Sequence, residues 1–349
     1  RMSNLTLKNS EKLSILRNFA ILLGSGIPII EAVDSLLEDT TGNQRKILST
    51  LKIDLMQGQQ IAVSLANYPR VFDKVTVNLI KAAEEAGTLE TTLHDLRDHV
   101  QKEMEFSDKI KFAMIYPILI MIVFIGVLFM ILVVVVPKIA TVFSRLKVDL
   151  PLPTRILIGA SDILINNTFL LGLGFVFIVA VIIIIYKKNR ELILGLYFSL
   201  PIISGLVKQI DFARFCRSLY LLLYSGLPIT IALGLAQDVV MNSQIKNLLI
   251  RSREMIIGGK KLSDGLRLGK KYVPTMMIKL VEAGERSGTL DKSMQELSEH
   301  LDYEVTNSLK AATAILEPIL LVIVGISVFG MMFAIIAHIY SLIGQVGVI

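Results

Sequence analysis

The sequence contains no tryptophan and one cysteine, and only 19% of its 349 residues are charged. About a quarter of the residues in soluble proteins are charged, so the shortage excludes intrinsic disorder, a coiled-coil rod and a wholly soluble enzyme. The single cysteine, Cys216, excludes an intramolecular disulfide and a cysteine-rich metal site, and we expect it to pack as a small apolar side chain in a helix. Without tryptophan or a stripe of basic and aromatic residues, the sequence argues against nucleic acid as a partner.

The motifs of hydrolases, nucleotide-binding proteins and metal centres are also missing. The segment nearest to a phosphate-binding loop, Gly258–Ser263, lacks the upstream glycine and the hydroxyl residue after its first lysine. His94 and His99 are five residues apart, which does not place them on one face of a helix. Carboxylate pairs such as Glu84 and Glu85 are expected to be solvated on helix surfaces. We therefore predict a protein that is not an enzyme, with no cofactor and no metal site.

The hydrophobic residues, 53% of the chain with a mean hydropathy of +0.63, are unevenly distributed, and three long apolar runs stand out. They cover residues 112–136, 168–186 and 318–337. Each run approaches or exceeds the ~20 residues that cross a bilayer as a helix. The rest of the chain is ordinary amphipathic sequence. We predict an all-α integral membrane protein with three transmembrane helices.

Basic residues gather beside particular ends of these spans, and the net charge of the chain is +6. Loops rich in lysine and arginine stay on the cytoplasmic side of a membrane. The residues concerned are Lys109 and Lys111 before the first span, Lys187, Lys188 and Arg190 after the second, and Lys310 before the third. Residues 1–111 and 187–317 are therefore predicted to be cytoplasmic, and the loop 137–167 and the tail 338–349 to be external. The chain opens without a signal-peptide pattern, so we expect a cytoplasmic N-terminus and an external C-terminus.

The chain contains an internal repeat with an offset of 200 to 201 residues. The recurring positions include Ser25, Gly26, Pro28, Glu84, Gly87 and Leu89 in the first copy and Ser225, Gly226, Pro228, Glu285, Gly288 and Leu290 in the second. Arg17 and Arg217, His99 and His300, Glu103 and Glu304, and Tyr116-Pro117 and Glu317-Pro318 also correspond. One residue of slippage over such a length indicates a tandem duplication, in which each copy is a cytoplasmic domain that leads into a span.

The repeated motifs have the composition of turns between helices. Leu89, Leu93, Leu96 and Val100 recur at helical spacing, and no useful stretch alternates as a β-strand would. In Ser-Gly-x-Pro the glycine permits the turn, and the proline suits the first turn of the next helix. The glycine of Gly-Thr-Leu is expected to act in the same way. We therefore predict that residues 1–111 and 187–317 are two tandem helical bundles.

One acidic residue, Glu317, stands at the boundary of a predicted span, at the position that Tyr116 has in the first copy. A carboxylate at the edge of the bilayer is costly unless water or a partner satisfies it. Lys310, one heptad earlier on the same helix, and a cationic group of another molecule are both candidate partners. A purely structural role is the alternative. Pro117 and Pro318 follow these two residues and mark the start of each span.

The second copy reads Gly284-Glu285-Arg286-Ser287-Gly288-Thr289-Leu290, a match to the motif Gly-Glu-x-Ser-Gly-x-Leu. With the Ser-Gly-x-Pro turns and the proline-marked span starts, this motif makes the chain resemble the inner-membrane platform proteins of type IV pili and type II secretion systems, the secretion F family. The first copy departs from the motif, with Ala83 and Ala86 where the family has glycine and serine. The chain lacks the N-terminal extension of many members, so it is similar to the short form of type IVb and competence pili.

The resemblance implies a multi-pass protein of the bacterial inner membrane that helps to pass pilin subunits from the bilayer into a growing fibre. It also implies the partners: a cytoplasmic hexameric assembly ATPase, pilin subunits, other inner-membrane assembly proteins, the lipid bilayer and further copies in a homo-oligomer. A permease-like membrane subunit of an ATP-driven transporter is the alternative, because it too would combine a repeat with an external ATPase. Against it, three spans with almost no polar residue inside can line little of a solute pathway.

Overall fold

The computed structural model describes residues 5–138, 140–141, 155, 158–159, 161 and 201–346, and no β-strand occurs among them. The prediction of an all-helical chain is confirmed for these residues. The second predicted span, 168–186, lies outside the described residues, as does most of the predicted loop 137–167. The chain divides into two compact units, which are Arg1–Lys109 with Ser204–Asn307, and Ile110–Ile203 with Ser308–Ile349.

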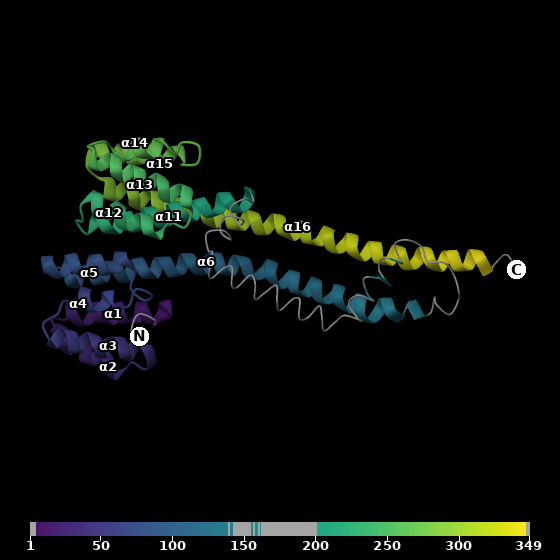
Figure 1. Cartoon of the computed structure of the whole chain (residues 1–349), viewed down its shortest axis with the longest axis horizontal. Helices are drawn as coiled ribbons and strands as arrows, with labels where there is room; N and C mark the ends of the chain where they lie inside the picture. Colours follow the sequence, from purple (N-terminus) through teal and green to yellow (C-terminus); the bar gives the residue numbers. More distant parts are fainter. Residues whose placement is uncertain are drawn as a thin grey trace. The chain divides into compact units, whose positions relative to one another are not determined.

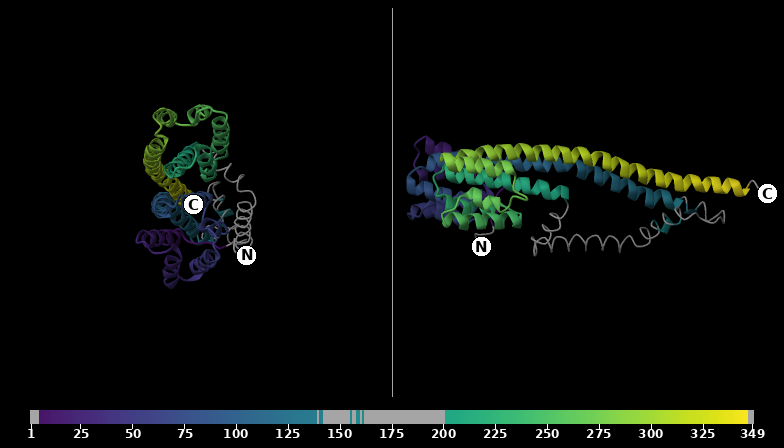
Figure 2. Two further views of the ribbon diagram at one scale, coloured as in Figure 1. Left: turned by 90° about the vertical axis from the view of Figure 1, so that its left-hand side faces the viewer. Right: turned by 90° about the horizontal axis from the view of Figure 1, so that it is seen from above.

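The first unit holds both copies of the repeat, and their helices follow the same order (Figure 1). The first copy contains α1 (Asn9–Gly24), α2 (Ile29–Glu38), α3 (Gly42–Met56), α4 (Ile61–Ala66), α5 (Lys74–Ala86) and the start of α6 (Leu89–Met130). The second contains α11 (Pro201–Tyr224), α12 (Ile229–Ala236), the 3-10 helix η3 (Gln237–Val239), α13 (Ser243–Ile257), α14 (Leu262–Arg267), α15 (Thr275–Ser287) and the start of α16 (Leu290–Val346). Seen end-on, the helices of each copy gather in a group of their own (Figure 2). Because both bundles belong to one compact unit, the domain boundaries 1–111 and 187–317 stay predictions.

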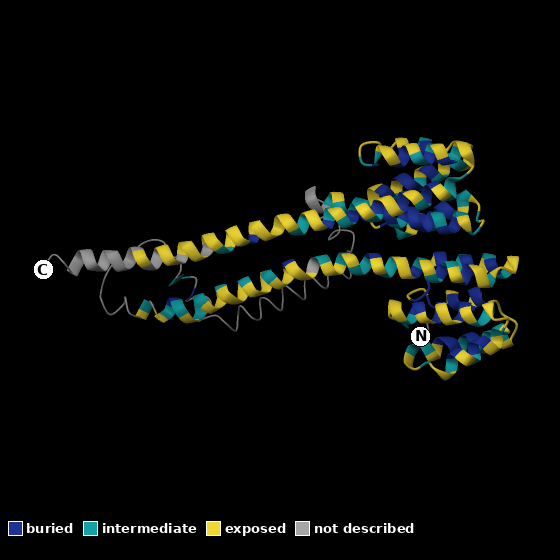
Figure 3. Cartoon of the chain, turned by 180° about the vertical axis from the view of Figure 1, so that it is seen from behind, coloured by how far each residue is buried: buried dark blue, intermediate teal, exposed yellow. Residues whose placement is uncertain are grey.

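Each bundle has an apolar core whose residues recur between the copies. Ala32 of α2 and Ala232 of α12 are repeat equivalents, and both are 0% exposed. Leu16 of α1 and Cys216 of α11 are also equivalents and also buried, so the cysteine packs as a small apolar side chain. Burial is concentrated in the bundles, whereas the outer parts of the long helices are mostly exposed (Figure 3). Because fully burying an aliphatic side chain contributes about 1.5–3 kcal/mol, these cores dominate the stability of the bundles.

The Ser-Gly-x-Pro segments lie between the first and second helices of each copy. Ser25 closes α1, Gly26 has a φ of +79°, and Pro28 stands at the N-cap of α2. The second copy repeats this arrangement between α11 and α12 with Ser225, Gly226 (φ +82°) and Pro228. The chain reverses direction within four residues because glycine adopts the left-handed backbone conformation at little cost and proline is pre-set for a helix start.

The Gly-Thr-Leu segments end the fifth helix of each copy. Gly87 and Gly288 are the left-handed C-caps of α5 and α15, with φ of +70° and +71°. The N–H of the residue after each glycine bonds to a carbonyl of the last helical turn at 2.9 Å, which satisfies a carbonyl that the helix leaves free. Leu89 and Leu290 then begin the two long helices, α6 and α16.

The two long helices continue from the bundles into the apolar runs of the sequence. α6 passes through Pro117 and joins the π-helix η2 (Ile131–Val135), and α16 passes through Pro318. Both are long and apolar enough to cross a membrane, by length and composition. Ile122 and Phe329 are 65% and 70% exposed, as side chains that face lipid would be. The prolines therefore stand inside continuous helices rather than at helix starts.

The left-handed glycines provide a test of the turn geometry. A methyl group at Gly288 would meet no atom within 4 Å, so Gly288→Ala strains only the backbone. We expect it to lower the free energy of unfolding by about 1 kcal/mol. The matched control is Gly205→Ala in α11, where the methyl group also has open space but the backbone is helical, so alanine should be neutral or stabilising. Thermal unfolding of the purified protein in detergent compares them, and equal effects would contradict the prediction.

Candidate functional site

A charged side chain, Arg217, lies in the core of the second bundle. It is 3% exposed, and its helix α11 also buries Phe212, Phe215 and Leu219. Removing a charge from water costs several kcal/mol in such surroundings, so the guanidinium group requires anionic partners within the fold.

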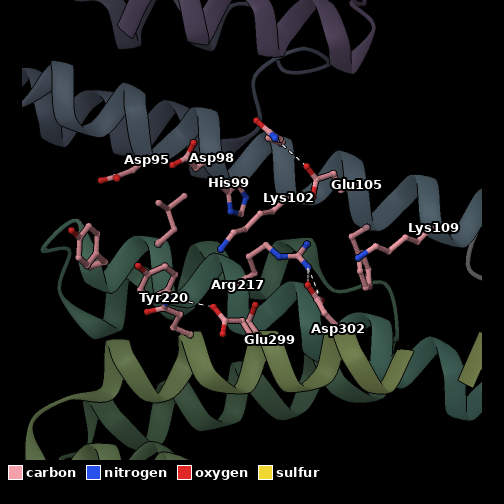
Figure 4. Close-up of a pocket in the computed structure, with 16 residues that line it drawn as sticks. Asp95, Asp98, His99, Lys102, Glu105, Lys109, Arg217, Tyr220, Glu299 and Asp302 are labelled. Atoms are coloured by element: carbon pink, nitrogen blue, oxygen red, sulfur yellow. Dashed lines mark hydrogen bonds and ion pairs between the residues drawn. The ribbon is translucent and has the colours of Figure 1, made fainter. Parts of the chain in front are cut away.

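The partners of Arg217 come from both long helices. One terminal nitrogen donates to Glu103 Oε2 on α6 at 2.5 Å. The other donates to both carboxylate oxygens of Asp302 on α16, at 2.6 and 2.5 Å (Figure 4). The guanidinium carbon also lies 4.8 Å from the centre of the Phe106 ring, which is a cation–π contact. One arginine therefore connects the long helix of the first copy to the long helix of the second.

Further ion pairs also join the two copies. Arg214, one turn before Arg217, forms a second ion pair with Glu103, with Nε at 2.8 Å from Oε1. Lys74 of α5 pairs with Asp238 of η3 at 2.8 Å, but the lysine side chain is 75% exposed. Exposed pairs contribute about 0–1 kcal/mol because water screens them. The buried Arg217 cluster is therefore the main electrostatic contact between the two copies.

A cavity of about 480 Å³ opens beside this cluster, between α6, α11 and α16. Charged side chains of both signs line it, and Arg217 lies among them (Figure 4). The acidic ones are Asp95, Asp98, Glu105, Glu299 and Asp302, and the basic ones besides Arg217 are Lys102 and Lys109. The cavity is suited to charged groups. Within the described part of the chain, no three histidine, cysteine or acidic side chains come together as ligands for a metal.

His99 of α6 lines the same cavity and is half-buried. Burial and the positive charge of Arg217 lower the pKa of His99 to about 4. Lys12 and Lys102 act on this pKa in the same direction, whereas Asp73 opposes them. The imidazole is therefore neutral in the folded protein at neutral pH.

The glutamate before each Gly-Thr-Leu segment caps another helix. Glu84 accepts hydrogen bonds from two successive backbone N–H groups at the start of α4, at 2.6 and 2.9 Å. Glu285 accepts the equivalent two bonds at the start of α14, at 2.5 and 3.3 Å. The first N–H groups of a helix lack intrahelical partners and carry the positive end of the helix dipole, so a carboxylate stabilises them. The expectation that Glu84 would be solvated on a helix surface is wrong, although its neighbour Glu85 is exposed.

Gly284 of the same motif marks a close contact between helices. A Cβ atom there would lie 2.9 Å from Ser293 Cβ and 3.1 Å from Leu290 Cα, so α15 and α16 approach too closely for a side chain. Ala83 has this place in the first copy and is buried. In the first copy, the alanine therefore places a methyl group where the second copy has none. The helix cap by Glu84 is retained.

Two repeat equivalents meet in the second unit, where the apolar runs begin. The hydroxyl of Tyr116 on α6 donates to Glu317 Oε1 on α16 at 3.3 Å, and both residues are exposed. The sequence suggests Lys310 or another molecule as the partner of Glu317 and misses Tyr116. The signal is present in the repeat, because equivalent residues on paired helices lie at similar depth. The carboxylate stays open to a further partner.

The Arg217 cluster is the site that sequence reasoning misses. The sequence shows Arg217 and Glu103 only as members of repeat-equivalent pairs. A signal for Arg217 exists, because an arginine in the apolar segment Phe212–Leu223 needs a buried partner. Its partners cannot be read from the sequence, because Glu103 and Asp302 come from distant segments on two other helices.

Substitution of Arg217 tests the contribution of the cluster. Arg217→Met keeps a long apolar side chain and leaves Asp302 without its counter-charge. We expect the free energy of unfolding to fall by about 3 kcal/mol. The matched control is Arg17→Met at the equivalent, exposed position of α1, which should change stability by less than about 0.5 kcal/mol. Thermal unfolding measures both, and losses of the same size would contradict a special role for Arg217.

The depressed pKa of His99 predicts a pH dependence. The pKa of His99 is about 4 in the folded protein and 6.5 in its ordinary state. Between pH 4 and pH 6.5 the unfolded chain therefore binds more protons than the folded chain. The stabilisation is complete above pH 6.5 and should fall on acidification, by roughly 2 kcal/mol between pH 7 and pH 4.5. His99→Gln should remove this part of the pH dependence. At pH 8 the imidazole is neutral in both states, so unfolding at this pH measures any packing effect of His99→Gln by itself. If the stability of the wild type and of His99→Gln falls in parallel with pH, the prediction is refuted.

Comparisons with known proteins match both copies of the repeat. The family model described as type II secretion system (T2SS), protein F, matches residues 15–137 and again residues 215–337. The chain is 28% identical to the type IV pilus assembly protein PilC of Myxococcus xanthus over 333 residues, 95% of this chain and 80% of the relative.

Two further relatives are named for the type IV pilus and for the type II secretion system, one for each. The chain is 29% identical to PilC of Pseudomonas aeruginosa over 335 residues, 95% of this chain and 89% of the relative. It is 29% identical to the type II secretion system protein F of Aeromonas hydrophila over 320 residues, 90% of this chain and 81% of the relative. The resemblance inferred from the motifs is confirmed, and the chain belongs to the type II secretion system protein F family.

Proposed function

We propose that this protein is the inner-membrane platform of a type IV pilus or a related type II secretion machine. In this role it couples a cytoplasmic hexameric assembly ATPase to the insertion of pilin subunits into the growing fibre. The names of its relatives, which are type IV pilus assembly proteins and type II secretion system F proteins, support the assignment. The observation that carries the coupling is the continuity of α6 and α16 from the bundles into the apolar runs.

Continuous helices suit a protein that carries motion from the cytoplasm into a membrane. Packed, rigid elements transmit a displacement along their length. Because Arg217 joins α6 to α16 through Glu103 and Asp302, a displacement of one copy is passed to both long helices. The partner ATPase supplies the energy in this scheme, and the chain supplies the connection.

We also propose how the chain crosses the membrane and which molecules it meets. Residues 1–111 and 187–317 form the cytoplasmic domains, and residues 112–136, 168–186 and 318–337 cross the membrane. The N-terminus is cytoplasmic, and the C-terminus is periplasmic. The domains meet the ATPase and other inner-membrane assembly proteins, while the spans meet pilins, lipid and further copies of the chain.

An apolar groove between α6 and α16 bears on the alternative of a transporter subunit. It has a volume of about 270 Å³, and the described residues that line it are all aliphatic or aromatic. They come from α6 between Leu119 and Leu128, from Ile131 of η2, and from Val324 and Val328 of α16. A solute pathway requires polar groups near the middle of the membrane. A groove of this kind suits the apolar helix of a pilin better than a polar solute.

A deletion strain separates the two functions. Loss of the gene should remove surface pili, or the secretion of a substrate protein, and leave solute uptake unchanged. The transporter alternative predicts the reverse, with uptake lost and pili retained. The wild-type gene supplied in trans should restore assembly.

The exposed carboxylate of Glu317 is the sharpest single-residue test of pilin insertion. Glu317→Gln keeps the shape and removes a charge that can guide the cationic N-terminus of a pilin. We expect normal protein levels and normal co-purification of the ATPase, with pilus number reduced at least about tenfold for the loss of a charge-assisted contact. Electron microscopy counts the pili.

The matched control for Glu317 is Tyr116→Phe, which removes the hydrogen bond between α6 and α16 but keeps the carboxylate. This variant should assemble pili normally. Equal loss of protein in both variants would assign the pair to stability alone. Wild-type piliation with Glu317→Gln would reject a guiding role for the charge.

A further inference from the structure

The loop after α14 differs in charge between the two copies of the repeat. In the second copy, residues 268–271 read Leu-Gly-Lys-Lys, and the loop contains no acidic residue before α15. The equivalent loop of the first copy begins with Asn67 and contains Pro69, one basic residue, Arg70, and one acidic residue, Asp73. Both loops follow a short helix that a motif glutamate caps in the same way. The fold therefore does not require the cations of the second loop.

The side chains of this loop are presented to the outside of the bundle. Leu268 is 63% exposed, and Lys270 and Lys271 are also exposed. Within the described part of the chain, neither lysine side chain has an ion pair or hydrogen bond, whereas the preceding Arg267 pairs with Glu282 at 2.6 Å. An apolar side chain beside unpaired lysines is the combination that binds the interface of a membrane with anionic lipids.

The position of the loop in the bundle is also defined. Tyr272 lies with its ring centre 5.7 Å from the ammonium of Lys208, near the start of α11. The loop and the start of α11 lie at the same end of the second bundle (Figure 1). At Ser204 the chain enters this bundle from the unit that contains the apolar runs. The loop is thus at the end of the bundle where the chain arrives from the proposed membrane segments, and Met276, 53% exposed, adds a second apolar side chain there.

We propose that the loop Leu268–Tyr272 lies against the cytoplasmic surface of the bilayer and binds the headgroups of anionic phospholipids. Lys270 and Lys271 contact the phosphates, and Leu268 enters the interface between headgroups and acyl chains. Because the same chain would already be anchored in the bilayer by its spans, the loop is confined near the membrane and weak contacts suffice to keep it there. The first copy has no equivalent contact, so the two halves of the duplicated protein differ in how they meet the membrane. This inference does not depend on which fibre or substrate the protein serves.

A fluorescent label on the loop tests the proposal in the full-length protein. Leu268→Cys carries an environment-sensitive dye, and the protein is placed in nanodiscs of phosphatidylcholine alone or with phosphatidylglycerol. The native Cys216 does not compete, because it is buried and burial raises the pKa of its thiol. Asn67→Cys, at the equivalent exposed position of the first copy, is the matched control.

We expect lipid-borne quenchers to reduce the emission at position 268 in anionic nanodiscs and to leave the emission at position 67 nearly unchanged. Lys270→Gln with Lys271→Gln should abolish most of the quenching at 268 without changing the unfolding temperature, and high salt should weaken it. Equal quenching at positions 268 and 67 would overturn the proposal. Quenching at position 268 that is unchanged in the variant with Lys270→Gln and Lys271→Gln would also overturn it. A spectral shift that occurs only after the assembly ATPase is added would also overturn it, because the loop would then bind protein.

Discussion

A single buried positive charge determines how the two halves of this protein are joined. Arg217 is 3% exposed, and the cost of desolvating its guanidinium group is met only when carboxylates surround it. Those carboxylates, Glu103 and Asp302, belong to the long helices of different copies. The requirement to pair one charge therefore holds α6 and α16 together inside the bundle unit. The charged cavity and the depressed pKa of His99 follow from the same cluster.

The two copies of the bundle have charged residues at some positions where the other copy has uncharged ones. In the first copy Lys12 is 9% exposed and pairs with Asp73 at 3.1 Å. Burial opposes the ionisation of Asp73, but the charge of Lys12 and the N–H of Thr76 hold its pKa below the ordinary value. The second copy has Phe212 and Pro274 at these positions. The pair is only partly buried, since the Asp73 side chain is 58% exposed, and a partly exposed ion pair contributes little net stability, so the bundle tolerates its loss.

Features that depend on neighbouring residues could be predicted from the sequence, and features that depend on distant residues could not. Helical spacing and apolar run length are local, so the all-helical class and the apolar parts of α6 and α16 were predictable. The caps that Glu84 and Glu285 provide join segments more than twenty residues apart, and nothing in the motif itself identifies the helix that it caps. The bond between Tyr116 and Glu317 requires two chain segments to be aligned in space. Such contacts need the fold before they can be named.

A double-mutant cycle between Arg217→Met and Glu103→Gln tests most directly whether Arg217 couples the two copies. Unfolding free energies of the wild type, both single variants and the double variant give the interaction energy. We expect an interaction of about 1.5 kcal/mol or more for a buried charged pair, and a value near zero for the matched cycle of Arg17→Met with Glu103→Gln. Additivity within about 0.5 kcal/mol in the Arg217 cycle would contradict the claim.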